Sequence, residues 1–423
     1  MLNELLEELA REAPTGGAPP DQLWRRGRRV ARTQRLGTIA IAAVACLLLI
    51  ALGSVTWQQR AVEVPPADGE IDSYLPSRFH PPSPRLPGTG SVGPMGTLIA
   101  TYAVPRKGWF GSSDGLVGVS ADTGVYAFLD LPHAALTVLL ESALAPDGRH
   151  VAYWTTGTVP DPVRDADEEP VNGYAVYDTV TGKVVAQRPS TERGLGYSEL
   201  IWFDSTHLGV EFGQMQDCCS SADSQSLVFD LTSGRTTSID IRLASASTNA
   251  VGSLVAGNDN SVVVEADGST TPAYVPQTAG QINGSQFVAL SPDAKRIAAI
   301  FGNGLPGPVH VKDIDTNVNG ERIPGSYVGV ICWLDETHLA ALQSHGEGPR
   351  VDLVAVDIED GSTEMLSEYV DHADLALKLI GSPVKTQPAP PYPGSPWRPT
   401  IAAVVTIVAA GCGILVWRRR AQA

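Results

Sequence analysis

The sequence predicts an all-β fold, a six- or seven-bladed β-propeller, flanked by two transmembrane α-helices. Three features of the 423-residue chain predict it: an uncharged apolar segment near each end, alternating apolar residues between them, and turn motifs that recur there. Alternation with period two marks half-buried strands, and recurrence near every 40 residues is typical of propeller blades. We expect, in order, a cytoplasmic Arg-rich tail (1–37), a transmembrane helix (38–57), a Pro-rich stalk (58–95), the propeller (96–370), a second stalk (371–398), a second transmembrane helix (399–417) and a cytoplasmic tail (418–423).

The N-terminal tail begins with a short amphipathic pattern. Leu2, Leu5, Leu6 and Leu9 fall on one face of a helix, which a Pro/Gly-rich segment ends at residues 14–20. A helix this short is marginal alone, so we expect it to lie on the membrane or to dock on a cytoplasmic regulatory protein. A frayed tail is the alternative. The tail lacks Cys and His, which argues against a zinc-type anti-sigma domain.

Two segments are long enough to cross a bilayer. No charged residue lies between Arg35 and Arg60, and nineteen uncharged residues separate Arg398 from Arg418. Nineteen helical residues cover about 28 Å, close to the hydrocarbon thickness of about 30 Å. Neither segment has the polar face of a globular helix, so both are predicted to span the membrane. Cleavage of the first segment as a signal peptide after Gly53 is the alternative.

Arginines beside these segments predict the orientation of the chain. They are Arg25, Arg26, Arg28, Arg29, Arg32 and Arg35 before the first span and Arg418, Arg419 and Arg420 after the second. Because cytoplasmic flanks carry the excess of Arg and Lys, both termini are predicted to be cytoplasmic and the central domain extracytoplasmic, with bilayer lipid as a partner. The tails carry net charges of +2 and +3, so the total of −16 leaves −21 between them. A domain this acidic repels nucleic acid, which excludes a nucleic-acid partner.

Short motifs recur in the central domain and define its predicted strands. An alternating strand followed by Asp, three residues and Gly occurs at 175–182, 227–234 and 354–361. The Asp side chain closes the turn and Gly supplies a positive φ, so each motif predicts a strand and turn of a hairpin. Two further pairs also match: APDGRHVAY (145–153) with SPDAKRIAA (291–299), and WFDSTHL (202–208) with WLDETHL (333–339).

The motifs at 145–153 and 291–299 resemble the strand motif of WD40-like, TolB-type propeller repeats. The resemblance covers about residues 96–370 and implies a propeller used in other lineages as a periplasmic or extracellular module. It implies no activity, because such propellers host unrelated functions. Only the first motif keeps Asp-Gly, and residues 250–267 carry their blade with little motif. The whole layout is similar to that of membrane-anchored actinobacterial proteins.

Two motifs match catalytic patterns without their context. Residues 122–124, Asp-Thr-Gly, have the form of an aspartic-protease triplet, but no second copy exists and a shortened repeat turn is favoured. Residues 111–115 match G-x-S-x-G, yet a nucleophile elbow joins a strand to a helix and a loop between strands is expected here. The eight His residues show no zinc-binding spacing. We therefore expect no catalytic residue, no cofactor and no metal.

An acidic loop, residues 161–173, is the one weak metal candidate. It contains Asp161, Asp165, Asp167, Glu168 and Glu169, whose oxygens could bind calcium. EF-hand spacing is absent, and a solvated acidic loop is favoured. Weak divalent-cation binding remains a hypothesis that a calorimetric titration with calcium would test.

The five cysteines divide by predicted compartment. Cys46 and Cys412 lie in the predicted spans, where they act as small apolar residues. Cys218, Cys219 and Cys332 would face an oxidising compartment. One disulfide among these three is predicted, and the vicinal pair and a bond to Cys332 both remain open.

These features favour a non-enzymatic, membrane-anchored extracytoplasmic module for binding, sensing or scaffolding. Its partner would be an extracellular protein or glycan that meets the loops around the central channel. A second interpretation is a propeller-type hydrolase or lactonase that uses acidic residues at the channel mouth. A third is a purely structural protein of the cell envelope.

Overall fold

A computed structural model describes residues 73–108, 111–163, 169–216, 221–243, 253–256, 262–272, 288–300, 306–314, 320–345, 350–370, 373–387 and 389. These residues belong to one compact unit, 63–393. Both predicted spans (38–57 and 399–417), the N-terminal helix and the arginines that predict the orientation lie outside the described residues. Within the described residues, no helix is long and apolar enough to cross a membrane.

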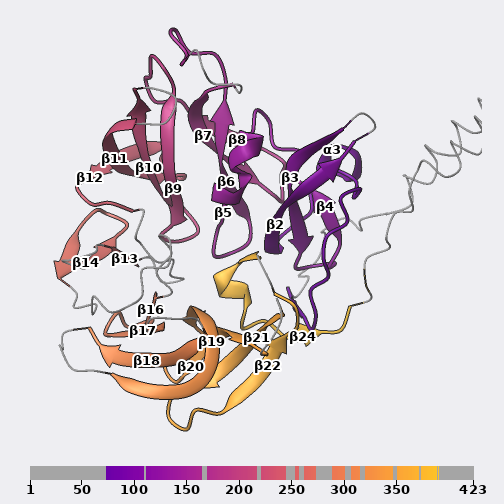
Figure 1. The fold of residues 1–423 in the computed structure, drawn as a ribbon, viewed down its shortest axis with the longest axis vertical. Helices are drawn as coiled ribbons and strands as arrows, with labels where there is room; N and C mark the ends of the chain where they lie inside the picture. Colours follow the sequence, from indigo (N-terminus) through magenta and orange to yellow (C-terminus); the bar gives the residue numbers. More distant parts are fainter. Residues whose placement is uncertain are drawn as a thin grey trace, which may run out of the picture. The chain divides into compact units, whose positions relative to one another are not determined.

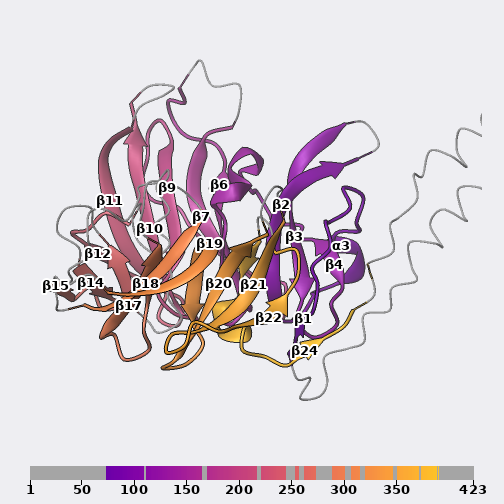
Figure 2. The same ribbon diagram turned by 60° about the horizontal axis from the view of Figure 1, so that its bottom comes forward.

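Antiparallel sheets dominate the described chain and form six groups, which we call blades 1 to 6 (Figures 1 and 2). Blade 1 contains β2 (Leu98–Lys107), β3 (Ser112–Ser120) and β4 (Tyr126–Phe128). Blade 2 contains β5 (Ala143–Leu144), β6 (His150–Thr156), β7 (Val171–Asp178) and β8 (Val184–Gln187). Blade 3 contains β9 (Leu195–Trp202), β10 (His207–Met215), β11 (Ser221–Asp230) and β12 (Arg235–Ile239). Blade 4 contains β13 (Ser253–Ala256), β14 (Val262–Glu265) and β15 (Thr270–Pro272).

Blades 5 and 6 share one long strand and so form a seven-stranded sheet. Its strands are β16 (Val288–Leu290), β17 (Arg296–Ile300), β18 (Gly307–Asp313), β19 (Glu321–Trp333), β20 (His338–Ser344), β21 (Val351–Asp357) and β22 (Thr363–Ser367). The first half of β19 pairs with β18 and the second half with β20. Gly325 lies at the switch, where a Cβ would collide with the Tyr327 ring. The strand thus passes from the last position of blade 5 to the first position of blade 6.

Strands from both ends of the described chain meet beside blade 1. The short strand β23 (Asp374–Leu375) pairs with β2 and supplies its first position. Nearby, β1 (Leu75–Pro76) pairs in parallel with β24 (Val384–Lys385). The folded unit therefore begins before residue 96 and continues past residue 370, the boundaries predicted for the stalks. The reason is that Leu75, Phe79 and Ile380, scattered among the prolines, are buried in the same apolar core.

Six apolar cores lie between neighbouring blades. Pairs that meet in them are Leu98 with Tyr153 (blades 1 and 2), Trp154 with Trp202 (2 and 3), Phe203 with Leu254 (3 and 4), Val263 with Ile297 (4 and 5), Val309 with Leu339 (5 and 6) and Leu353 with Ile99 (6 and 1). Because every blade shares a core with two neighbours, the six blades close into a ring. The predicted all-β propeller is confirmed, with six blades among the described residues. The flanking transmembrane helices stay a prediction.

The repeated motifs occupy one end of the blades, which we call the turn face. Asp178, Asp230 and Asp357 each end a third strand and accept hydrogen bonds from the backbone N–H two residues later. The glycines four residues after them have φ values of 69°, 68° and 74°, which confirms the predicted hairpins. The two other motif pairs all join a first to a second strand. The opposite end, the loop face, carries the second-to-third loops and a 3₁₀ segment, η1 (Leu136–Glu141), between blades 1 and 2.

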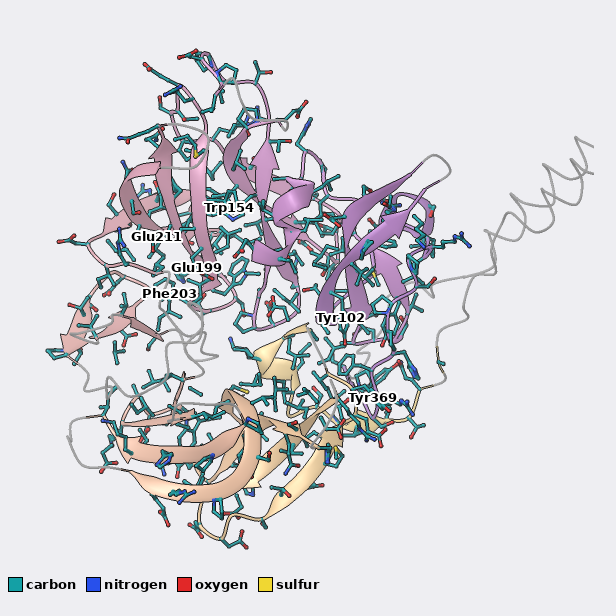
Figure 3. The ribbon with its side chains drawn as sticks, viewed as in Figure 1. Tyr102, Trp154, Glu199, Phe203, Glu211 and Tyr369 are labelled. Atoms are coloured by element: carbon teal, nitrogen blue, oxygen red, sulfur yellow. The ribbon has the colours of Figure 1, made fainter. Side chains whose placement is uncertain are left out.

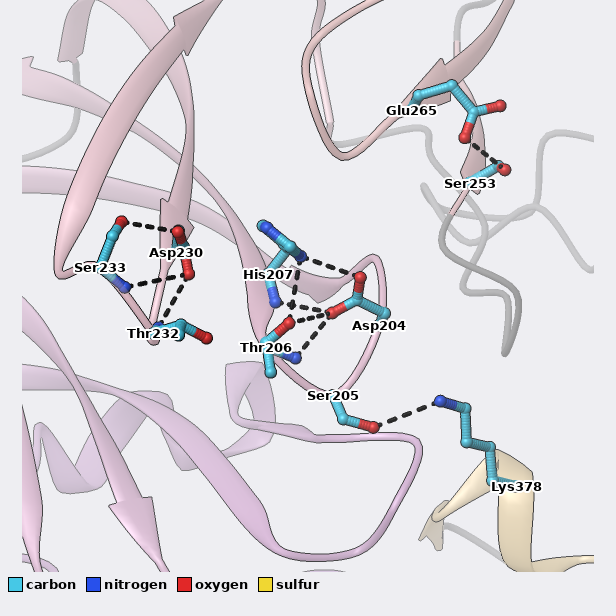
Figure 4. Close-up of polar contacts among 10 residues, drawn as sticks. All are labelled: Asp204, Ser205, Thr206, His207, Asp230, Thr232, Ser233, Ser253, Glu265 and Lys378. Atoms are coloured by element: carbon cyan, nitrogen blue, oxygen red, sulfur yellow. Dashed lines mark hydrogen bonds and ion pairs between the residues drawn. The ribbon is translucent and has the colours of Figure 1, made fainter.

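Two further short helical segments flank the closing strands. Helix α3 (Thr89–Val92) precedes β2, and the 3₁₀ segment η2 (Leu377–Leu379) follows β23. On the turn face, η2 reaches the turn between β9 and β10, where Lys378 Nζ lies 3.4 Å from Ser205 Oγ (Figure 4). The closing segment therefore links blade 1 to blade 3.

Candidate binding site

The acidic loop predicted as a weak metal candidate is described at its two ends. Asp161 Oδ2 lies 4.0 Å from Arg193 Nε, and Glu169 precedes β7. Asp165, Asp167 and Glu168 lie outside the described residues. Over the described part of the chain, no group of three or more His, Cys, Asp or Glu side chains is placed to hold a metal ion. Cation binding by this loop stays a prediction.

Both motifs with catalytic patterns belong to blade 1 hairpins. Residues 122–124 form the turn between β3 and β4, where Gly124 has a φ of 66° and donates its N–H to Ser120 O at 2.8 Å. This confirms the turn interpretation. Residues 112–115 lie within β3, not in the expected loop, because the pairing of β2 with β3 continues to Lys107 and Ser112. The element after β3 is another strand, so the strand-to-helix context of a nucleophile elbow is absent there.

Cys332 is a free thiol in the core between blades 6 and 1. Its side chain is 1% exposed, and its S–H donates to Leu377 O at 3.9 Å. Burial raises its pKa to about 12, so the thiol stays protonated and inert at neutral pH. Cys332 forms no disulfide within the described residues, and the pairing of the three cysteines stays a prediction. Cys218 and Cys219 lie outside the described residues.

On the turn face, polar side chains bind one another within each turn (Figure 4). Asp204 accepts hydrogen bonds from the N–H of Thr206 at 2.6 Å and of His207 at 2.9 Å, and its Oδ2 lies 2.8 Å from His207 Nδ1. Asp335 holds His338 in the same way. Burial would raise the pKa of Asp204, but these hydrogen bonds outweigh it and lower the pKa below its usual range. Such satisfied networks stabilise turns and leave few groups free to bind a ligand.

Two carboxyl groups on first-position strands behave differently. Burial raises the pKa of Glu199, in β9, to about 7, and the charges of Glu141 and Glu211 contribute. Glu211 lies directly opposite Glu199 in β10. Asp374 has solvent-exposed surface, but many protein atoms lie around its carboxyl group. The resulting desolvation raises its pKa to about 7. Its carboxylate accepts a hydrogen bond from the Leu144 N–H at 2.6 Å. These two groups change protonation near neutral pH, a property that is common at functional sites.

The loop face carries a cavity of about 120 Å³ between the β2–β3 hairpin and η1. Its lining residues are Ala103, Val104 and Pro105 of β2, Asp114 of β3, and Leu136, Leu139 and Leu140 of η1. Leu139 is buried in the core between blades 1 and 2 and anchors η1. Leu136 and Leu140 are instead 44% and 81% exposed. A cavity of roughly 150 Å³ holds benzene, so this one is large enough for one aliphatic side chain.

The hairpin wall of the cavity is fixed to blade 1. A Cβ at Gly115 would lie 2.7 Å from the Phe128 ring, so only glycine lets the hairpin pass there. Arg106 forms an ion pair with Asp130 at 2.6 Å. Asp130 also accepts the Gly90 N–H at 2.7 Å. These contacts hold the hairpin where Figure 2 shows it, extending away from the ring.

The η1 wall of the cavity is fixed to blade 2. The Ala135 N–H donates to Trp154 O at 2.9 Å, and the Thr156 N–H donates to His133 O at 2.8 Å. Val138 of η1 packs in the same core as Trp154. Figure 3 shows Trp154 and Glu199 on neighbouring blades. The cavity therefore lies between two firmly attached walls.

An aromatic group continues this apolar surface toward blade 3. Tyr197 of β9 is 43% exposed, and its ring centroid lies 6.1 Å from that of Trp154. The indole Nε1 of Trp154 is buried without a hydrogen-bond partner among the described residues. Together with η1, Tyr197 gives the loop face a partly exposed apolar surface.

One carboxyl group, that of Asp114, belongs to the lining of the cavity. Glu141, the last residue of η1, is not among the lining residues, and its charge acts on Glu199 of β9. The side chain of Glu141 is exposed, but desolvation by neighbouring atoms raises its pKa. The sequence did not identify the residues that line the cavity, because residues 111–115 were assessed only for a nucleophilic serine. The pattern that could have indicated the site is the pair of leucines at 136 and 140, four residues apart in a segment between hairpins.

Comparisons with known proteins give low similarity. No protein-family model and no curated protein matches the sequence. Among solved structures, the chain is similar to an oligogalacturonate lyase in complex with manganese (TM-score 0.42, 12% identity, 65% of this chain and 76% of that one). It is also similar to the β-propeller domain of the Trilobed protease from Pyrococcus furiosus (0.41, 14%, 70% and 83%) and to TolB from Acinetobacter baumannii (0.33, 14%, 65% and 65%). Our propeller assignment depends on the six blades and six cores, not on these scores.

Proposed function

We propose that the central domain is an extracytoplasmic binding module, held to the membrane by a segment at each end, that recognises a protein partner through its loop face. The observation that carries the proposal is the exposure of Leu136 and Leu140 beside an apolar cavity. Exposed apolar side chains at a cavity are typical of binding sites, and propeller loops commonly bind ligands. A protein partner fits this surface better than a glycan because leucines, not polar groups, dominate it.

The attachment to the membrane rests on the two apolar segments of the sequence. Support comes from β1 and β24, which bring the chain ends that lead to these segments side by side. Reporter fusions near residues 75 and 385 test this part, and we expect an extracytoplasmic location at both. A cytosolic signal at either position would contradict the exported domain.

Photo-cross-linking in living cells tests the binding surface. A cross-linking amino acid at Leu140 should give a discrete product with one envelope protein. The same amino acid at Val185 of β8, which is 48% exposed on the outer strand of blade 2, should give none. Equal products at both positions, or no product at Leu140, would contradict the proposal and favour a purely structural role.

The N-terminal helix is proposed to bind a cytoplasmic regulator. Its apolar face, Leu2 to Leu9, supports this part. Deletion of residues 1–13 should abolish recovery of the regulator while the loop-face cross-link persists. Recovery that survives the deletion would remove the helix from the proposal.

A further inference from the structure

The cavity on the loop face has an apolar interior and an acidic border. All of its lining residues are apolar except Asp114. An apolar cavity alone would accept any apolar group, so the charge of Asp114 decides which ligands fit.

The volume of the cavity restricts the apolar part of the ligand. About 120 Å³ accommodates one aliphatic side chain, and an aromatic ring at most. The hairpin wall and the η1 wall are each tied to their own blade by backbone hydrogen bonds or ion pairs. We therefore expect a single side chain to insert, with the neighbouring residues of the ligand lying across the exposed Leu136 and Leu140.

The charges around the cavity restrict the rest of the ligand. Among the described residues, Asp114 forms no ion pair with a cation, and Arg106 of the same hairpin is paired with Asp130. The segment between the two tails carries −21. A cationic group on the ligand would be attracted to the Asp114 carboxylate, and an anionic membrane surface would be repelled.

We propose that this cavity is a docking site for a partner polypeptide in which an apolar side chain, such as leucine, is followed by a basic one. The inference rests on the proposed function and names the chemistry of its ligand. The apolar side chain fills the cavity, and the guanidinium or ammonium group meets Asp114. An anionic lipid surface is the rival ligand that the test includes.

The test compares small probes on the full-length chain in nanodiscs of neutral lipid, with saturation-transfer NMR as the measurement. Acetyl-Leu-Arg-amide should bind about tenfold more tightly than acetyl-Leu-Glu-amide, because the Asp114 carboxylate and the acidic domain attract one probe and repel the other. Acetyl-Gly-Arg-amide should bind roughly tenfold more weakly than the Leu-Arg probe, because it leaves the cavity empty. Asp114→Asn should reduce the preference for Arg over Glu about threefold. Glu359→Gln, which removes an equal charge from the turn face, should leave that preference unchanged.

Variants of the apolar lining complete the test. Ala103→Phe fills the cavity and should abolish binding of the Leu-Arg probe, and Leu136→Ser provides the same readout if Ala103→Phe fails to fold. Equal affinities for the Arg and Glu probes would overturn the charge inference. Binding of phosphatidylglycerol vesicles that Leu140→Ser removes would overturn it in favour of a lipid ligand. In both cases a persisting cross-link at Leu140 would show that the proposed protein binding stands.

Discussion

The two ends of the propeller differ in whether their polar groups are hydrogen-bonded and whether their apolar side chains are buried. On the turn face, aspartates such as Asp204 and Asp178 accept hydrogen bonds from the turns that they close. On the loop face, Leu140 is mostly exposed beside a cavity, and Glu141 has a raised pKa. The turn face repeats the same solution from blade to blade, whereas η1 occurs once. Repeated, satisfied turns hold the ring together, and among the described residues the surface beside η1 is the one that we propose for binding.

The largest expected effect on stability concerns two glycines of the turn face. Gly148 and Gly234 have similar φ values, 73° and 68°. A Cβ at Gly148 would collide with Leu98 O, whereas nothing lies within 4 Å of a Cβ at Gly234. Gly234→Ala should lower the free energy of unfolding by about 1 kcal/mol and Gly148→Ala by about 3 kcal/mol or more, as measured by urea denaturation. Similar losses in both variants would show that backbone strain alone decides the cost.

A smaller loss is expected from Asp204 and Asp335, the aspartates of the matching motifs at 202–208 and 333–339. Asp204→Ala should lower the free energy of unfolding by about 2 kcal/mol, since it removes two backbone hydrogen bonds and the contact with His207. Asp335→Ala should cost about 1 kcal/mol, because its side chain is 57% exposed against 29% for Asp204. Neither change should weaken the cross-link at Leu140. A turn-face variant that folds but no longer cross-links would break the division between the two faces.

The pH dependence of stability should come from the inner strands. The pKa of Glu199 is raised to about 7 in the folded protein, from a reference value of 4.5, so folding favours its protonated form. Its contribution to stability is complete below about pH 4.5 and is lost as the pH rises through about 7. Glu199→Gln should therefore flatten the decline in unfolding free energy between pH 5 and 8, with Glu359→Gln as the control. An unchanged profile would place this carboxyl group in solvent.

The smallest effect on stability is expected from the loop face. Leu140→Ser should change the free energy of unfolding by less than about 0.5 kcal/mol, because its side chain is 81% exposed. Its effect on binding should nevertheless be large, measured as loss of the partner from a cross-linker placed at Tyr197. A large loss of stability instead would mean that Leu140 packs against the rest of the fold and is not available to a ligand.

Sequence reasoning predicted the elements that local chemistry specifies. The hairpins at Asp178, Asp230 and Asp357 follow from an aspartate and a glycine at fixed spacing, and the structure confirms each. The strand β23 could not be predicted, because two residues carry no period and their partners in β2 lie near the other end of the domain. A Pro-rich composition also concealed β1, whose burial depends on contacts from blades 1 and 6.

The candidate site was predictable only in part, for a physical reason. The spacing of residues in the sequence indicates local turns and strands. The exposure of a side chain depends instead on which other segments the fold packs against it. Leu139 and Leu140 are adjacent in an apolar run, yet one is buried and the other exposed. Cys332 was counted among three candidates for one disulfide from its predicted compartment, and only the fold shows that its side chain is buried in the core between blades 6 and 1.

The late arrival of β23 has a consequence for how the chain must be made. Synthesis proceeds from the N-terminus, so β2 leaves the ribosome early. The edge of β2 that pairs with β23 stays unpaired until Asp374 and Leu375 have also left the ribosome. An unpaired strand edge invites pairing with the wrong strand or with another molecule. The yield of correctly assembled protein should therefore depend on how well chaperones shield that edge during elongation, more than on the stability of the finished ring.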